Sequence, residues 1–236
     1  MNDLIVDVKL WGESVGSLYW EKESNAALFD YERKFIRSGL DISPIIMPIS
    51  QYRNTPYRFL ENRTDCFKGL PGLFADSLPD TFGNQIINEW FASKGLSGEE
   101  ITPLDRLCYV GKRGMGALEF EPSSPINGMN ESSVLHIEEL TELAKSVFTD
   151  RMAFQVQLRQ EGRNILDILK VGTSAGGAKP KAIIAYNDIT GEVQSKYVIN
   201  MDDTFCCWYS CRFSLFTMIR ASTRIEIASC HCYLLF

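Results

Sequence analysis

The sequence has few of the residues that build disulfide frameworks and proton shuttles. The first 200 residues contain two cysteines, Cys66 and Cys108, which excludes a disulfide-stapled fold and fits a reducing compartment. The whole chain has two histidines, His136 and His231. This small number argues against a hydrolase with a Ser-His-Asp triad. His136 stands where an amphipathic helix is expected to start, which gives it a surface or capping role.

Long apolar runs and an excess of positive charge are also missing. The longest apolar stretch, residues 205–219, has Arg212 in its middle, whereas a membrane-spanning helix needs ~20 apolar residues. The first residues alternate apolar and acidic side chains and lack the features of a signal peptide. The net charge of −6 argues against nucleic-acid binding driven by overall charge. We therefore expect a cytoplasmic protein that contacts neither membrane nor nucleic acid directly.

What is present is the pattern of an α+β fold that begins with a small sheet. Alternating apolar residues and turn signals predict three strands over residues 4–10, 15–20 and 26–31. A helix capped by Ser77, with Pro79 in its first turn, is expected to end at 94–95, and a shorter helix is expected over 103–109. Residues 111–120 predict a glycine loop that runs into a strand.

Linker composition divides the chain after this part. Pro, Gly, Asn and Ser are concentrated in residues 121–133, which separates a subdomain of residues 1–120 from a second region, 134–200. In that region we expect helices over 137–148 and 152–158. A glycine loop over 172–177 then leads into a strand over 181–186, and a turn at Gly191 leads to a further strand over 197–199.

The last part of the chain, residues 201–236, has a different composition. It contains no Gly, Pro, Lys, Asn or Gln, and 22 of its 36 residues are apolar. It also holds five of the seven cysteines, but their spacing is not that of a zinc site, and no metal is expected. We interpret this tail as out-of-frame translation after a frameshift; the alternative is a genuine but unusual hydrophobic tail.

The glycine loop over residues 172–177 is the strongest chemical feature. Closely spaced glycines let backbone N–H groups approach phosphate oxygens, and Lys179 and Lys181 supply positive charge directly afterwards. It is not a Walker A motif, because Ala178 occupies the lysine position and a strand follows instead of a helix. A glycine loop followed by a strand lysine is the order in a kinase amino-terminal lobe. The alternative is a plain tight turn.

The loop over residues 111–116 could also cradle an anion, but no helix begins at its exit, so a structural role is favoured. Residues that kinase chemistry needs are missing. No Asp is followed five residues later by Asn, and Asp-Phe-Gly does not occur. No catalytic residue is therefore assigned.

Three blocks resemble the HipA-like serine/threonine kinase toxins. They are residues 69–80 (GLPGLFADSLPD), 111–118 (GKRGMGAL) and 173–182 (TSAGGAKPKA), in the order and with the spacing of that family. The resemblance covers residues 1–200 and stops there. It implies a bacterial toxin of a type II toxin–antitoxin module that phosphorylates a protein Ser or Thr with ATP and Mg²⁺.

The resemblance also implies site residues and a partner. Lys181 matches the ATP-contacting strand lysine, and Ser174 matches a loop serine that members autophosphorylate. The matching phosphate loop consists of Ser174, Ala175, Gly176, Gly177 and Ala178. The subdomain of residues 1–120 resembles the part that helps to contact a small helix-turn-helix DNA-binding antitoxin.

The family's catalytic Asp, metal ligands and helical carboxy-terminal lobe would follow the point where this chain changes composition. We therefore expect an amino-terminal sheet subdomain with helices, then the start of a kinase amino-terminal lobe, with the carboxy-terminal lobe missing. The expected function is that of a truncated HipA-like toxin without kinase turnover. The alternative is a non-catalytic binding module that docks the antitoxin or a separate kinase subunit.

Overall fold

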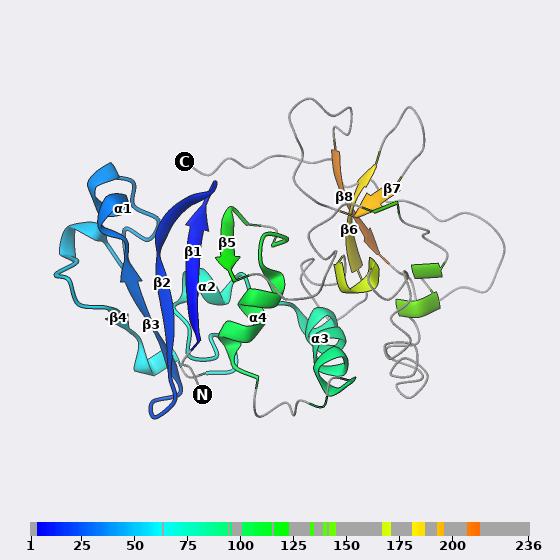
Figure 1. The fold of residues 1–236 in the computed structure, drawn as a ribbon, viewed down its shortest axis with the longest axis horizontal. Helices are drawn as coiled ribbons and strands as arrows, with labels where there is room; N and C mark the ends of the chain where they lie inside the picture. The colour runs from blue at the N-terminus through cyan, green and yellow to red at the C-terminus, as the bar shows by residue number, and fades with distance from the viewer. Residues whose placement is uncertain are drawn as a thin grey trace. The chain divides into compact units, whose positions relative to one another are not determined.

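The computed structural model of the chain contains two compact units (Figure 1). The first comprises residues 1–78 and 99–125, and the second comprises residues 79–98 and 126–236. Each has its own antiparallel sheet. The residues that the structure describes are 4–62, 64–93, 95, 101–114, 116–122, 133–134, 139–140, 142–144, 167–170, 181–186, 193–195 and 207–212.

The first unit is built on a five-stranded sheet. Its strands are β1 (Ile5–Leu10), β2 (Glu13–Glu21), β3 (Ala26–Tyr31), β4 (Tyr57–Arg58) and β5 (Leu118–Glu121), in the order β4-β3-β2-β1-β5. The first three strands form a meander, and β5 returns from far along the chain to pair with β1 (Figure 1). The three strands predicted at the start of the chain are confirmed, and so is the strand after the loop at 111–116.

A tight turn joins β1 to β2. Trp11 and Gly12 both have positive φ, 52° and 81°, as a two-residue type I′ hairpin turn requires. The Trp11 side chain at this tip is exposed. A bulky residue in this conformation is uncommon. The geometry of the turn therefore outweighs the intrinsic preference of Trp11 for a negative φ.

The hydrophobic core of the first unit covers one face of this sheet. Val6, Val8 and Leu10 alternate with more exposed residues along β1 and are buried. The ring centroid of Phe29 lies 4.7 Å from those of Tyr31 and Phe74. Each fully buried aliphatic or aromatic side chain contributes roughly 1.5–3 kcal/mol, so this core supplies much of the free energy of folding of the unit.

Local signals set the ends of the helices in this unit. α1 (Arg33–Ser38) begins after Glu32, whose carboxylate accepts the Lys34 N–H, and it ends at Gly39. α4 (Pro103–Val110) begins with a capping box formed by Thr102 and Asp105, which confirms the helix expected over 103–109. The shorter elements are η1 (Ile49–Gln51), η2 (Leu60–Asn62) and α2 (Gly72–Ala75).

In the second unit, α3 (Thr81–Ser93) begins later than predicted. The expected cap at Ser77 is wrong, because Asp80 Oδ1 accepts the Gly83 N–H at 2.7 Å and so caps the helix. Pro79 precedes the helix, and its carbonyl accepts a hydrogen bond from the Asn84 side chain at 2.6 Å. The apolar face predicted by the spacing is confirmed by the buried residues Phe82, Ile86 and Ile87.

The sheet of the second unit has three strands, β6 (Lys181–Tyr186), β7 (Val193–Ser195) and β8 (Cys207–Arg212), in the order β7-β6-β8. The strand predicted over 181–186 is confirmed. Its returning partner is β7, and the predicted range 197–199 lies outside the described residues. β8 belongs to the tail for which no regular element was expected.

Helical residues in this unit are described at 139–140, 142–144 and 167–170, the first two within the helix expected over 137–148. The helix expected over 152–158 lies outside the described residues. Across the described ranges, no helix has both the length and the apolar character needed to cross a membrane.

Candidate functional site

A buried polar network joins three described segments of the second unit. The Ser133 hydroxyl donates a hydrogen bond to Asp167 Oδ1 at 2.7 Å, and Lys170 Nζ donates one to Ser133 Oγ at 3.2 Å. Ser195 Oγ accepts the Ser133 N–H at 2.9 Å, and Ser195 N–H donates to the Ser133 carbonyl at 2.8 Å. These four residues are called the Ser133 network.

Burial makes this network energetically significant. Asp167, Lys170 and Ser195 are 2%, 7% and 1% exposed. A buried charge costs several kcal/mol unless hydrogen bonds and an opposite charge compensate for it. The network supplies both, because it holds one carboxylate, one ammonium and the hydroxyl that joins them. Its geometry is therefore strongly specified, and it fixes the helical residues 167–170 to β7.

The Ser133 network lies on both sides of the predicted phosphate loop in the sequence. Lys170 comes two residues before Gly172. Ser195 of β7 pairs with Ile184 of β6, the strand that begins at Lys181. The described segments on both sides of residues 171–180 in the sequence are thus connected to one network, Lys170 directly and β6 through its pairing with β7.

The sequence analysis missed all four residues of this network. Asp167 and Lys170 carried a weak signal, because they are charged residues three positions apart in an otherwise apolar helical turn and so share one helix face. Ser133 and Ser195 are 62 residues apart in the sequence, and no local pattern links them. Ser133 is the last residue of the predicted linker, 121–133.

An exposed apolar loop stands out in the first unit. Ile45 is 88% exposed, and Ile46 and Leu40 are 56% and 45% exposed. We call residues 40–46 the Ile45 loop. Contiguous exposed apolar side chains mark binding surfaces on soluble proteins, so this loop is a candidate docking surface.

The backbone of the Ile45 loop is held in place. The Asp41 carboxylate accepts the N–H groups of Ser43 at 3.1 Å and Ile49 at 3.0 Å. Tyr31 donates its hydroxyl to the carbonyl of the fully buried Met47 at 2.8 Å. Burial and the nearby Asp41 raise the pKa of Tyr31, so its phenol stays protonated as the donor. The exposure of Ile45 and Ile46 therefore belongs to an anchored loop.

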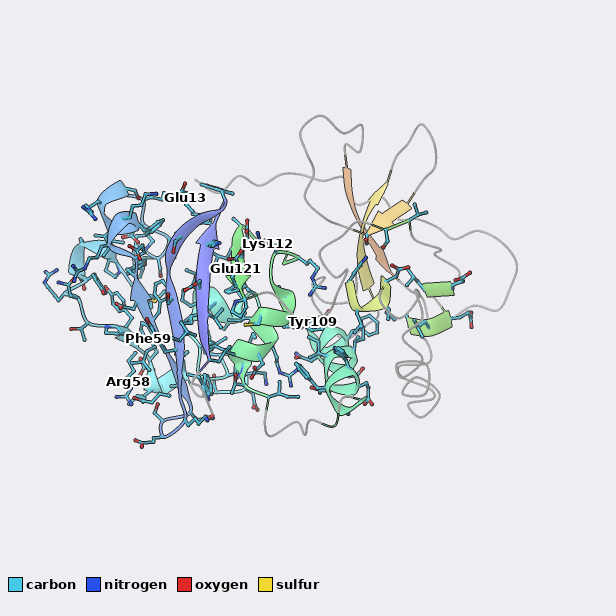
Figure 2. The ribbon with its side chains drawn as sticks, viewed as in Figure 1. Glu13, Arg58, Phe59, Tyr109, Lys112 and Glu121 are labelled. Atoms are coloured by element: carbon cyan, nitrogen blue, oxygen red, sulfur yellow. The ribbon has the colours of Figure 1, made fainter. Side chains whose placement is uncertain are left out.

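An ion network lies beside β5. Glu121 pairs with Lys9 at 2.5 Å and with Lys112 at 3.2 Å, and Figure 2 shows Lys112 and Glu121 at this edge of the sheet. The hydrogen bond from Lys9 is the main cause that lowers the pKa of Glu121. Since each cation has a carboxylate partner, these contacts join β5 to β1 and leave little unbalanced charge for a ligand.

The turn after α4 is organised by Arg113. Its side chain is buried, donates to the Tyr109 carbonyl and places its guanidinium carbon 5.1 Å from the centre of the Tyr109 ring. The Gly111 carbonyl accepts the Phe120 N–H at 3.2 Å. These contacts use the loop at 111–116 to connect α4 to β5, which favours its structural interpretation over anion binding.

Contacts of Gly69, Leu70 and Phe74 in this unit explain the first part of the block at residues 69–80. Gly69 has a φ of 79°, and its carbonyl accepts the Ala27 N–H at 2.8 Å. A Cβ atom at Gly69 would lie 2.5 Å from the Asn25 carbonyl oxygen, so only glycine allows this approach to β3. Leu70 and Phe74 then enter the core.

The HipA N-terminal domain family matches residues 6–121 of the chain. This part of the chain is HipA-like. The matched range runs from β1 to β5 and contains both the Ile45 loop and the block at 69–80. A comparison with curated proteins gave no match.

The predicted ATP-binding residues, which lie beyond this HipA-like part, are only partly described. Ser174, Ala175, Gly176, Gly177 and Ala178 lie outside the described residues. Lys181 is the first residue of β6 and lies opposite Arg212 of β8 in the sheet. Within the described part of the chain, His, Cys, Asp and Glu residues form no group arranged to hold a metal ion.

Proposed function

We propose that this HipA-like chain belongs to a type II toxin–antitoxin module of the bacterial cytoplasm and that its first unit docks a small helix-turn-helix antitoxin. The observation that carries the proposal is the anchored, exposed Ile45 loop within the HipA N-terminal domain. Among the described residues of the first unit, His, Cys, Asp and Glu form no group that could hold a metal ion. An anchored, exposed apolar surface supports binding as the function of this unit.

The chemistry of the loop defines the partner's surface. Ile45 and Ile46 are adjacent aliphatic side chains that present apolar area without exposed charge of their own. The matching partner surface is an apolar patch or groove on a small helical protein, which buries these side chains at roughly 25 cal/mol per Å². Because the loop is already anchored, it loses less conformational entropy when the partner binds.

The test is capture of the helix-turn-helix antitoxin from the same operon by the purified chain. We expect a stable complex with the unchanged chain and at least roughly tenfold weaker binding by Ile45→Asp, because a buried carboxylate would replace an apolar anchor. Leu60→Asp, at an exposed apolar position outside the loop, is the matched control and should bind normally. An operon without such a protein, or equal binding by Ile45→Asp, would contradict the proposal.

We also propose that the second unit derives from the ATP-binding region of a protein serine/threonine kinase that uses Mg²⁺. The glycine-rich stretch 172–177 and the strand at 181–186 that follows it support this. The 236-residue polypeptide itself is proposed to lack turnover, because phosphoryl transfer needs an Asp that orients the hydroxyl and carboxylates that hold Mg²⁺. Its sequence has neither the Asp-x₄-Asn nor the Asp-Phe-Gly pattern.

Radiolabelled ATP with Mg²⁺ tests this second proposal directly. We expect no transfer of label to protein substrates and none to the chain itself. A Ser174→Ala variant is the control that identifies any label at the serine implied by the family resemblance. Label on a substrate, or label on the chain that Ser174→Ala removes, would overturn the proposed lack of turnover.

A further inference from the structure

Three exposed arginines lie on the segments next to the Ile45 loop in the first unit. Residues 32–53 contain four cationic side chains and two carboxylates, in a chain whose net charge is −6. One of the four cations, Lys34, pairs with Glu13 at 3.2 Å. In the part of the chain that the structure describes, no carboxylate forms an ion pair with the other three, Arg33, Arg37 and Arg53. We call these three residues the arginine rim.

The two carboxylates of this segment bind backbone N–H groups. Glu32 caps α1, and Asp41 accepts hydrogen bonds from the backbone at the Ile45 loop. The rim arginines donate to carbonyl groups: Arg37 to the carbonyl one helical turn before it at 3.3 Å, and Arg53 to two carbonyls at 2.9 and 3.1 Å. A neutral carbonyl holds a guanidinium in place without cancelling its charge. The surface around the loop is therefore locally positive.

A cluster of tyrosine rings connects the rim to the loop. The ring centroids of Tyr31, Tyr52 and Tyr57 lie 5.8–6.2 Å apart, and Phe35 of α1 stacks on Tyr31. The hydroxyls of Tyr31 and Tyr57 donate to the carbonyls of the two residues that follow the loop, at 2.8 Å each. Thus α1, the Ile45 loop and the chain that leads to β4 pack together at the edge of the sheet beyond β3 (Figure 1).

The rim arginines lie within electrostatic reach of this tyrosine cluster. Burial is the main cause that raises the pKa of Tyr52 and of Tyr57; Arg33 opposes the increase at Tyr52, and Arg53 opposes it at Tyr57. Arg37 is one helical turn from Arg33, and the loop begins two residues after the end of α1. The apolar side chains of the loop and the positive charges therefore belong to one continuous surface.

We propose that the arginine rim selects a partner segment that is acidic beside its apolar face, an acidic amphipathic helix. The apolar face would cover the Ile45 loop, and its flanking carboxylates would meet the guanidinium groups. This arrangement matches the general anatomy of interfaces, in which an apolar centre holds the partner and charges at the edge guide its approach. The antitoxin as the source of this helix rests on the proposed function, whereas the surface rests on the contacts above.

A short acidic helix fits this surface better than an extended polyanion does. The net charge of −6 repels DNA or an anionic bilayer, which meets the field of the whole chain. A short segment meets only the local charge, since screening limits these interactions to about 8–10 Å at physiological salt. The aliphatic side chains at the centre also have no favourable contact with a phosphate backbone.

Kinetic binding measurements with the full chain test the inference. The probes are the helix-turn-helix antitoxin from the same operon and a synthetic amphipathic helical peptide with a leucine face flanked by Glu. We expect both to bind, and their affinity to fall about tenfold or more between about 50 and 500 mM NaCl, because salt screens the rim charges. A peptide with Lys in place of Glu should bind at least about tenfold more weakly.

Substitution of the rim separates its role from that of the loop. The triple variant Arg33→Gln, Arg37→Gln, Arg53→Gln should slow association about fivefold or more and change dissociation little, since charges at the edge act mainly on encounter. Lys at the same three positions should keep most of the rate. Lys22→Gln removes a positive charge at the exposed turn between β2 and β3, at the other end of β3 from α1, and should change nothing.

The outcomes separate this inference from the proposed function. Antitoxin binding that Ile45→Asp weakens but that salt and the triple Gln variant leave unchanged would overturn the inference and leave the proposed function standing. Rim-dependent binding of the acidic peptide without any binding of the antitoxin would do the reverse. Binding to phosphatidylserine vesicles in place of the acidic peptide would also overturn the inference. The rim is exposed, so the triple variant should melt within about 2 °C of the unchanged chain, and the salt dependence of the unchanged chain tests the inference without any substitution.

Discussion

The Ser133 hydroxyl is the point at which a buried carboxylate and a buried ammonium meet in the second unit. It donates to Asp167 and accepts from Lys170, so it uses both its donor and its acceptor capacity. No apolar side chain of similar size can replace it, since both charged partners would lose a hydrogen bond at once. The energetic importance of this small residue thus comes from the burial of its neighbours.

We expect Ser133→Ala to lower the free energy of unfolding by about 1–3 kcal/mol, the cost of leaving a buried partner unsatisfied. Urea unfolding of the full chain, followed by circular dichroism, measures this. Ser14→Ala, at an exposed position of β2, is the control and should change stability by less than about 0.5 kcal/mol. If the two variants behave alike, the Ser133 network does not contribute to stability.

The ionisation of Glu121 should make the stability of the first unit depend on pH. Its pKa is lowered in the folded state, chiefly by the hydrogen bond from Lys9, so the stabilisation is present above the unfolded pKa of ~4.3 and is lost as the pH falls through the folded pKa. Lys9→Gln should cost about 1 kcal/mol or less at pH 7, because both partners are partly solvent-accessible.

The Lys9→Gln variant should lose less free energy of unfolding than the unchanged chain when the pH falls from 6 to 3. Guanidinium unfolding at a series of pH values provides the comparison. Lys34→Gln serves as the control, since its pair with Glu13 is well exposed and should leave the pH profile unchanged. Parallel profiles for the unchanged chain and Lys9→Gln would show that the pair does not set the acid sensitivity.

At the scale of elements, the pairing of β2 with β3 depends on a missing side chain. A Cβ atom at Gly16 would lie 2.2 Å from the Asp30 carbonyl oxygen and 2.9 Å from the Phe29 ring. Neither neighbour can move easily, because one is backbone within the sheet and the other is a fully buried ring. We expect Gly16→Ala to destabilise the first unit by about 2 kcal/mol or more.

Thermal unfolding followed by near-ultraviolet circular dichroism measures this effect through the aromatic core around Phe29. Gly116→Ala is a matched control, since the nearest neighbouring atom to its added Cβ would be 3.9 Å away, at ordinary contact distance. A Gly16→Ala chain that melts at the same temperature as this control would mean that the two strands can separate at little cost.

The elements that sequence predicted well are those with local causes. Alternation of Val6, Val8 and Leu10 and the Thr102–Asp105 capping box are visible within a few residues. The α3 cap was assigned wrongly because Ser77 and Asp80 are both good caps, and the Ser77 N–H instead belongs to the turn after α2, where it donates to Phe74. The Ser133 network and the β6–β8 register depend on long-range pairing, for which local patterns carry no information.

At the scale of the whole molecule, the structure revises the interpretation of the tail, residues 201–236. Its composition predicts no fold, yet residues 207–212 form β8 and pair along the whole of β6. The origin of the tail by frameshift stays a prediction that translation of the other reading frames would test. A strand can form in either case, because apolar and aromatic residues such as those of β8 have high β-propensity.

We expect removal of residues 201–236 to destabilise the second unit alone. Without β8, β6 has an unpaired edge that can template aggregation. Hydrogen exchange should show loss of protection at the β6 amides that pair with β8, while the amides of β1 to β3 keep theirs. Unchanged protection in β6 would mean that β8 contributes nothing to this sheet.

The pairing of β1 with β5 has a consequence for synthesis on the ribosome. Lys9 and its partner Glu121 are 112 residues apart, and residues 79–98, which lie between them, belong to the other unit. At ~5–20 residues per second, synthesis of the 112 residues from Lys9 to Glu121 takes roughly 6–22 seconds. The edge of β1 stays unpaired for that time. During that interval, nascent chains on neighbouring ribosomes present the same open edge, so an exchange of β5 between two copies competes with closure within one.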